Sequence, residues 1–182
     1  INNVTAATID YAKAAVSTNG GINAANTKSL TITGADAVTT GNITAANIET
    51  VSATAAKALI VGAIDSATAN KLTTVNLTST TEGVTATTIG LAANTETLNV
   101  TINAAKDISQ TGAINSTKVG NISATSTAGA VTLGAIGANA TTMGDVTVNA
   151  KGNATTSGAI GTVANLKTLG TVSMTSTDGF VA

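Results

Sequence analysis

The sequence predicts an all-β protein, a right-handed parallel β-solenoid of about seven turns with 21 to 26 residues in each turn. Three observations lead to this fold class. The chain carries an internal repeat, each repeat contains short strand-like pieces, and the composition suits a narrow core. A repeat of this length cannot bury an apolar face alone, so we expect the turns to stack on one another.

The repeat is visible through three markers. The first is an apolar residue at the centre of segments such as "TTVNLTS"; these anchors are Leu30, Val51, Val75, Leu98, Ile122, Val146 and Val172. The second is an apolar residue that closely follows a glycine: Ile22, Ile43, Ile64, Leu91, Ile114, Ile136 and Ile160. The third is an asparagine shortly afterwards: Asn26, Asn47, Asn70, Asn94, Asn115, Asn139 and Asn165. A period shared by three markers is typical of stacked repeats.

Each repeat contains pieces with the alternation of a half-buried strand. In "LTTVNLTST", residues 72–80, we expect Leu72, Val75 and Leu77 to point inward. Asn76 and Thr78 then point outward, as does Thr74. Neighbouring strands lie about 4.8 Å apart, so about seven turns make a rod roughly 30 to 35 Å long.

The composition agrees with a narrow solenoid core. Aromatic residues make up 1% of the chain, Tyr11 and Phe180 alone, and Val, Ile, Leu, Ala and Thr can fill such a core. A mean hydropathy of +0.33 with 9% charged residues argues against intrinsic disorder. A net charge of −1 gives no reason to expect a nucleic-acid partner, and the absence of cysteine excludes disulfides and thiolate metal sites.

The asparagines have a local explanation, because Asn tolerates the left-handed backbone of a tight corner. We expect a ladder in which stacked amides bond to one another along the axis, built from Asn26, Asn47, Asn70 and Asn94. Its position relative to the anchors changes after Asn94, so we expect the ladder to break there. The glycine before each apolar marker is expected to form another corner.

We expect residues 1–182 to form one solenoid segment, with 1–20 as an irregular first turn or cap. Within it, residues 7–17 fit either a helix or an irregular turn. The chain begins at Ile1 and shows no signal peptide, so we expect it to be a piece of a longer protein. Tyr11 and Phe180 lie near its two ends and are candidates for partial plugs of the core.

No catalytic or cofactor-binding residue is assigned, and we do not expect an enzyme. The chain has no His and no Cys, and the acids occupy different positions in the repeat. Glu49 and Glu96 share a position but lie two turns apart, roughly 10 Å, whereas a catalytic pair needs acids on neighbouring turns. The eight lysines form no stripe, so we expect no basic binding face.

The ligands of any metal site are unknown from the sequence alone. The calcium-binding nonapeptide G-G-x-G-x-D is missing, since only Gly20 and Gly21 match its start. A single Ca²⁺ held by a loop aspartate and backbone carbonyls stays an open alternative. The longest apolar stretch, "ALIVGAI" at 58–64, is too short to span a bilayer, so we expect no transmembrane segment.

Ice binding through T-x-T arrays on a flat solenoid face is a further alternative. The T-x-T pairs are Thr31/Thr33, Thr85/Thr87, Thr95/Thr97, Thr125/Thr127 and Thr175/Thr177. They occupy different positions in the repeat, so we do not expect them to stack into one array.

Residues 66–108 resemble the Ala/Thr/Ser/Gly-rich repeats of bacterial surface-layer (S-layer) proteins, of the Gram-negative, type I-secreted kind found in Caulobacter and Campylobacter. The shared elements are "LTTVNL", "TLNVT", the lack of cysteine and the low charge. The resemblance implies a secreted, self-assembling structural protein of the extracellular bacterial surface. It also implies Ca²⁺ at lattice contacts, and lipopolysaccharide bound through a domain outside this segment. The missing calcium nonapeptides depart from part of that family's pattern.

The predicted function is therefore structural: an S-layer subunit that forms a protective lattice with copies of itself. The alternative is the passenger or stalk of a bacterial adhesin or autotransporter, whose repeats are similar. We expect no cofactor in this segment, with Ca²⁺ possible at the lattice contacts.

Overall fold

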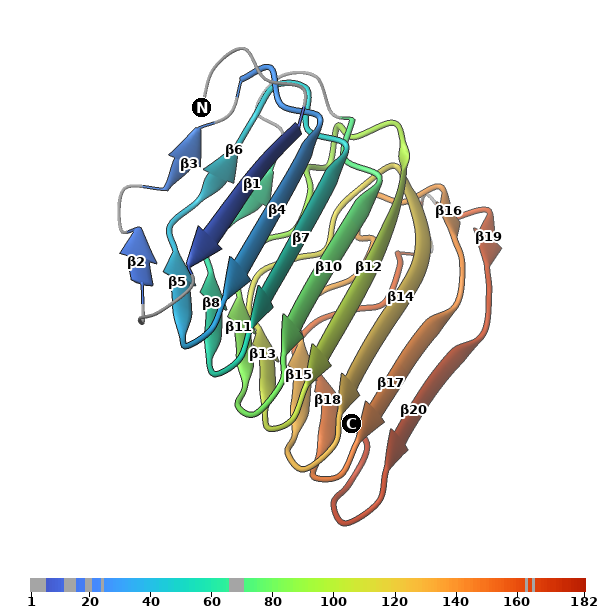
Figure 1. The fold of residues 1–182 in the computed structure, drawn as a ribbon. Helices are drawn as coiled ribbons and strands as arrows, with labels where there is room; N and C mark the ends of the chain where they lie inside the picture. The colour runs from blue at the N-terminus through green and yellow to red at the C-terminus, as the bar shows by residue number, and fades with distance from the viewer. Residues whose placement is uncertain are drawn as a thin grey trace.

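The computed structural model describes residues 6–11, 16–18, 21–23, 25–65, 71–162, 164 and 166–182. In these residues the protein is all-β, and its strands stack in parallel as a β-solenoid of about six turns (Figure 1). The predicted fold class is confirmed, with slightly fewer turns than the predicted seven. Every turn passes through three sides, and the three sides enclose one hydrophobic core.

The first side is a ten-stranded sheet, whose strands all pair in parallel. Its strands are β1 (Ala6–Tyr11), β4 (Ser29–Gly34), β7 (Thr50–Ala55), β10 (Thr74–Ser79), β12 (Thr97–Ala104), β14 (Lys118–Ser126), β16 (Thr142–Met143), β17 (Val146–Ala150), β19 (Thr168–Leu169) and β20 (Val172–Ser176). In the last two turns the long strand is split, so that β16 and β17 both pair with β14.

The second side is a seven-stranded sheet of short strands. They are β2 (Val16–Thr18), β5 (Val38–Thr40), β8 (Leu59–Val61), β11 (Val84–Ala86), β13 (Ile108–Gln110), β15 (Val131–Leu133) and β18 (Ala154–Thr156). The third side begins with β3 (Ile22–Asn23), β6 (Ile43–Thr44) and β9 (Ile64–Asp65). It continues as single bridges that join Ile64, Ile89, Ile114, Ile136 and Ile160 in turn.

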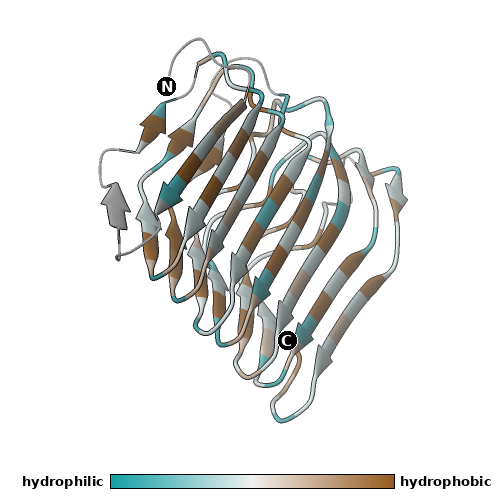
Figure 2. Ribbon diagram, in the orientation of Figure 1, coloured by the Kyte–Doolittle hydropathy of each residue, from teal (hydrophilic) through white to brown (hydrophobic). Residues whose placement is uncertain are grey.

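The alternation predicted for residues 72–80 is confirmed. Leu72, Val75 and Leu77 are almost completely buried, while Asn76 and Thr78 are half-buried on the outer face. Figure 2 shows the same alternation as apolar and polar bands along the strands of the ten-stranded sheet. Each fully buried Val or Leu contributes about 1.5 to 3 kcal/mol, so the stacked apolar columns hold the turns together.

One predicted anchor is wrong. Val75 pairs with Val100, and not with Leu98. Leu98 instead pairs with Val119, and the register between β12 and β14 shifts between Leu98 and Val100. Residues two apart on a strand point to the same side, and both Leu98 and Val100 are buried. The apolar pattern alone therefore could not choose between them.

One marker on the third side is also wrong. The isoleucine ladder passes through Ile89, and not through Leu91. In this turn the marker glycine, Gly90, follows the isoleucine and has a φ of +74°, a backbone conformation that glycine adopts without steric cost. Gly137 and Gly161 follow Ile136 and Ile160 in the same way.

The glycines that precede the third-side isoleucines lie at a corner. Two different structural features require glycine there. Gly21, before Ile22, has a φ of +73°. Gly134, before Ile136, has no such φ, but a Cβ added to it would lie 1.5 Å from the carbonyl oxygen of Gly112 in the preceding turn. No side chain fits there, because the backbones of neighbouring turns approach too closely.

The described part of the first turn is regular β-structure and not helix. β1 pairs with β4 along its whole length, from Ala6 opposite Ser29 to Tyr11 opposite Gly34, and β2 pairs with β5. The rest of the segment predicted as a cap lies outside the described residues, as does the side chain of Tyr11. Phe180 is 58% exposed, so the prediction that it plugs the core is wrong.

Candidate functional site

The outer face of the ten-stranded sheet carries two columns of short polar side chains. The parallel register places one outward residue of each strand beside its counterpart in the next turn. From β4 to β20 the first column is Thr31, Ser52, Asn76, Thr101, Ser123, Thr147 and Ser173. The second is Thr33, Thr54, Thr78, Asn103, Thr125, Asn149 and Thr175. Neither column contains a charged residue.

The T-x-T pairs do not stack into one array, as predicted, although single members of three pairs share a column. Thr33, Thr125 and Thr175 lie in the second column, and Thr31 lies in the first. Ser and Asn fill the remaining positions, which a search for Thr alone does not find. Thr85 lies on the other sheet, as predicted for residues at a different position in the repeat.

Charged residues lie at both edges of this face. We call the residues just before the long strands the leading edge: Lys28, Glu49, Lys71, Glu96, Lys118 and Lys167. We call those just after the long strands the trailing edge: Asp36, Lys57, Glu82, Lys106, Lys151 and Asp178. From β4 to β12 the sign of the charge alternates from turn to turn along each edge.

The alternation brings opposite charges together on neighbouring turns. At the leading edge, Lys28 Nζ lies 2.9 Å from Glu49 Oε1. At the trailing edge, Lys57 Nζ lies 2.8 Å from Asp36 Oδ2. Two further trailing-edge pairs are Lys106–Glu82, at 2.6 Å, and Lys151–Asp178, at 3.9 Å. The described lysines therefore lie at the edges but interleave with acids, which is why the sequence shows no basic stripe.

The best-defined of these pairs shifts the pKa values of both partners. The hydrogen bond from Lys57 to Asp36 lowers the pKa of the Asp36 carboxyl, and a 2.7 Å hydrogen bond from the Ala37 backbone N–H adds to this effect. The same hydrogen bond raises the pKa of Lys57, with smaller contributions from the charges of Asp36 and Glu82. Both groups are ionised at neutral pH.

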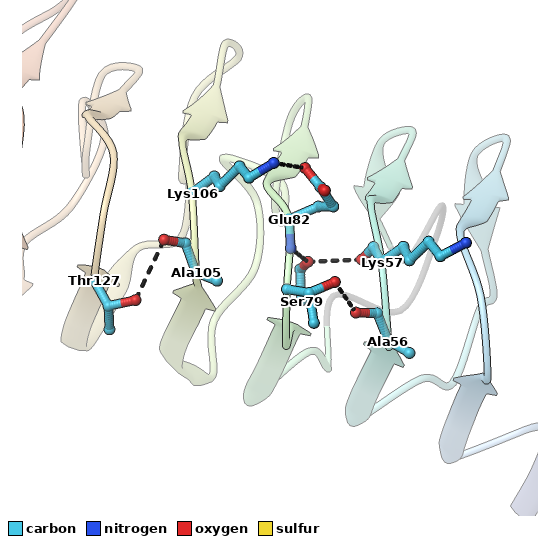
Figure 3. A network of polar contacts seen from close by, with 8 residues as sticks. Ala56, Lys57, Ser79, Glu82, Ala105, Lys106 and Thr127 are labelled. Atoms are coloured by element: carbon cyan, nitrogen blue, oxygen red, sulfur yellow. Dashed lines mark hydrogen bonds and ion pairs between the residues drawn. The ribbon is translucent and has the colours of Figure 1, made fainter.

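The trailing edge is fixed to the turns beneath it by side-chain hydrogen bonds (Figure 3). Ser79 Oγ donates to the carbonyl oxygen of Lys57 at 2.6 Å and accepts from the backbone N–H of Glu82 at 3.2 Å. Thr127 Oγ1 donates to the carbonyl oxygen of Ala105 at 3.2 Å. Because each corner is bonded to the preceding turn, the charged residues are held at regular heights along the axis.

The asparagine ladder differs from the prediction in its bonding. Asn47 Nδ2 donates to the carbonyl oxygen of Ala25 at 3.2 Å, and Asn94 Nδ2 donates to that of Leu72 at 2.7 Å. Both amides thus donate to the backbone of the preceding turn, where the stacked corner offers a carbonyl that needs a donor. Asn70 lies outside the described residues.

The break predicted after Asn94 is confirmed. In the next turn Ser116 is fully buried, and its Oγ donates to the carbonyl oxygens of Asn94 and Glu96 at 3.0 and 2.8 Å. A serine hydroxyl therefore takes over the role that the asparagine amide has in the preceding turn.

No group of three or more Asp, Glu, His or Cys residues that could hold a metal ion is found within the described ranges. Glu49 and Glu96 line a shallow groove together with Lys71 and Thr73, so a lysine lies in the same groove as the two acids. Asp145 Oδ1 accepts the backbone N–H of Thr171 at 2.8 Å. No ligands are therefore assigned to a metal ion among the described residues.

In the part of the chain that the structure describes, no helix is long and apolar enough to cross a membrane. No protein-family model, curated protein or solved structure matches this chain. The geometry of the solenoid and the residues on its surface are therefore the basis for assigning a function.

Proposed function

We propose that this protein is a structural, self-assembling S-layer subunit that forms a protective lattice on the extracellular surface of a bacterium. The observation that supports this most is the outer face of the ten-stranded sheet. It presents short polar side chains turn after turn, and from β4 onward its charges stand at the two edges, apart from Asp145 between β16 and β17. Such a repeating surface suits contacts with many identical neighbours.

The bonding between stacked turns also supports a structural role. Each turn is joined to the next by backbone hydrogen bonds in three sheets and by one continuous core. The hydrogen bonds of the corners are also made between turns, as at Asn94 and Ser79. A rod built in this way resists bending and leaves few loose loops for proteases, which is what a protective layer requires.

Two parts of the proposal rest on the sequence resemblance. Calcium at lattice contacts would bind to carboxylate and carbonyl oxygens, the ligands that Ca²⁺ prefers. Exposed acids such as Glu96 and Asp178 are of this type. Attachment to lipopolysaccharide belongs to a domain outside this segment.

The test is assembly in solution. Purified protein is dialysed against buffers with and without Ca²⁺ and imaged by negative-stain electron microscopy. The proposal expects two-dimensional arrays of parallel rods, with better order when Ca²⁺ is present. Protein that stays monomeric at every calcium concentration would contradict it. Arrays of wild-type protein that bind no cell surface would favour a stalk or passenger over a surface layer.

A further inference from the structure

Four long strands of the ten-stranded sheet, β4, β7, β10 and β12, and its last turn carry opposite charges at their two edges. β4 begins after Lys28 and is followed by Asp36, and β7 begins after Glu49 and is followed by Lys57. The sign at the leading edge is thus reversed from one turn to the next, and the sign at the trailing edge is reversed with it.

The same rule holds for the next two turns. β10 lies between Lys71 and Glu82, and β12 lies between Glu96 and Lys106. Asp107 follows Lys106, but its Oδ1 accepts the backbone N–H of Ala130 at 2.8 Å. These side chains are exposed or half-buried, so they can reach a neighbouring molecule.

Of the three later turns, two have a charge at one edge only, and the last has opposite charges at both edges. β14 begins at Lys118 and has no charge at its trailing edge, and β17 has Lys151 at its trailing edge and none before β16. The last turn has Lys167 before β19 and Asp178 after β20. Across the described strands, no long strand is flanked by charges of one sign alone, although β12 has Asp107 beside Lys106 at its trailing edge.

We infer that copies of this protein associate side by side, parallel and level, with the leading edge of one copy against the trailing edge of the next. In this arrangement Lys28 faces Asp36 of the neighbour, and Glu49 faces its Lys57. The same match occurs at the next two turns and at the last one. The two polar columns then continue from one molecule to the next as a single surface.

The alternating charges also determine the register of one copy relative to the other along the solenoid axis. A slip of one turn, about 4.8 Å, would place Lys28 opposite Lys57 and Glu49 opposite Glu82. Exposed ion pairs contribute little affinity individually, but complementary charges select the register and suppress wrong pairings.

This contact joins two different surfaces, so it is heterologous, and copies related by translation alone do not close into a ring. Repeated, it gives an open row of parallel rods. The inference rests on the proposed function, because a surface-layer subunit must form such rows, and it names the surface through which they form.

The test is to give one edge a single sign of charge, so that no register restores the match. A leading-edge variant carries Glu49→Lys and Glu96→Lys, which makes this edge basic throughout. A trailing-edge variant carries Lys57→Glu and Lys106→Glu, which makes the trailing edge acidic at the turns of β4 to β12. The substitutions remove only exposed ion pairs, which contribute little to stability, so each chain should fold, which circular dichroism and thermal unfolding verify.

Association is measured by sedimentation velocity and electron microscopy at low ionic strength. Each variant alone should need a protein concentration at least about tenfold higher than wild type to associate, because like charges now meet at two of these four turns, and a slip of one turn does not separate them. An equal mixture of the two variants should associate like wild type, since the leading-edge variant matches the trailing-edge variant. Added salt should weaken the association of wild type.

Three outcomes would overturn the inference: wild type that stays monomeric at low salt, a folded single-edge variant that associates like wild type, or a mixture of folded variants that does not associate. The outcome for the proposed function is separate. Arrays that form equally well from the single-edge variants would leave the surface-layer proposal standing and remove this interface. Rows of rods that form as predicted but never order into arrays would support this interface and contradict the surface-layer proposal.

Discussion

Two valines in the same column of the core show what holds this solenoid together. Val75 lies between Val51 and Val100, and it is 0% exposed. Val172, in the last strand of the sheet, pairs with Val146 on one side only and is 41% exposed. The two residues share their type and their orientation, so the difference comes from the number of neighbouring turns.

The rest of the last turn behaves in the same way. Leu169 and Val181 are 47% and 50% exposed, whereas their partners in the preceding turn, Met143 and Ala154, are buried. In a solenoid, a turn gains its stability from contacts with adjacent turns and little from within itself. The comparison of a central turn with the last turn can be tested with matched substitutions.

The largest difference is expected for the two valines. Val75→Ala should lower the free energy of unfolding by about 1.5 to 3 kcal/mol, because it removes buried methyl groups and leaves a cavity between two turns. Val172→Ala should change it by less than about 0.5 kcal/mol. Urea unfolding followed by circular dichroism measures both. Equal losses for the two variants would mean that the last turn is packed as tightly as the central ones.

A smaller difference is expected for asparagines at the corners. Asn94 is buried and bonds to the carbonyl oxygen of Leu72, so Asn94→Ala should cost about 1 to 3 kcal/mol by leaving that carbonyl unpaired. Asn139, at a later corner, is exposed, and Asn139→Ala should have an effect within about 0.5 kcal/mol. The same urea titration serves for this pair. If Asn139→Ala lowered the free energy of unfolding as much as Asn94→Ala, the burial of the Asn94 amide would not explain its contribution.

The smallest effect is expected for the ion pairs. The folded-state pKa of Asp36 is lowered, so its stabilisation is present above the unfolded pKa near 4 and is lost as the pH falls through the folded value. Asp36→Asn should therefore lower Tm by at most about 2 °C at pH 7 and leave it unchanged near pH 2. The raised pKa of Lys57 predicts the converse, a loss as the pH rises above about 10.5.

The last turn provides the control for this experiment. The charged atoms of Lys151 and Asp178 are 3.9 Å apart, against 2.8 Å for Lys57 and Asp36. Asp178→Asn should thus shift Tm less than Asp36→Asn at pH 7, as differential scanning calorimetry can measure. A larger shift for Asp178→Asn would show that ion pairs stabilise the last turn more than the central ones.

The charged edges could have been found in the sequence. Lys28 and Glu49 each stand two residues before an anchor, and Asp36 and Lys57 each stand six residues after one. The signal is hidden when lysines and acids are considered separately, because each edge alternates between them. Aligning charges of both signs on the anchors brings the pattern out.

The register errors at Leu98 and Leu91 have a different origin. A strand has a period of two, so a shift by two residues keeps the same face inward, and the apolar pattern is equally satisfied by Leu98 and Val100. In the same way, both Ile89 and Leu91 flank Gly90. Only the contact with the neighbouring turn distinguishes the two choices.

The parallel solenoid, its period and the inward and outward faces of its strands can be predicted from the sequence alone, because they follow from a repeat too short to bury its own apolar residues. The tertiary structure was needed to establish which residues of successive turns pair. It also decided that the corner amides bond to the backbone, as Asn94 does to Leu72, and that the outward Thr, Ser and Asn residues form two columns. The physical reason is that these features depend on the distance between turns, which is set when the backbones of adjacent turns bond to each other.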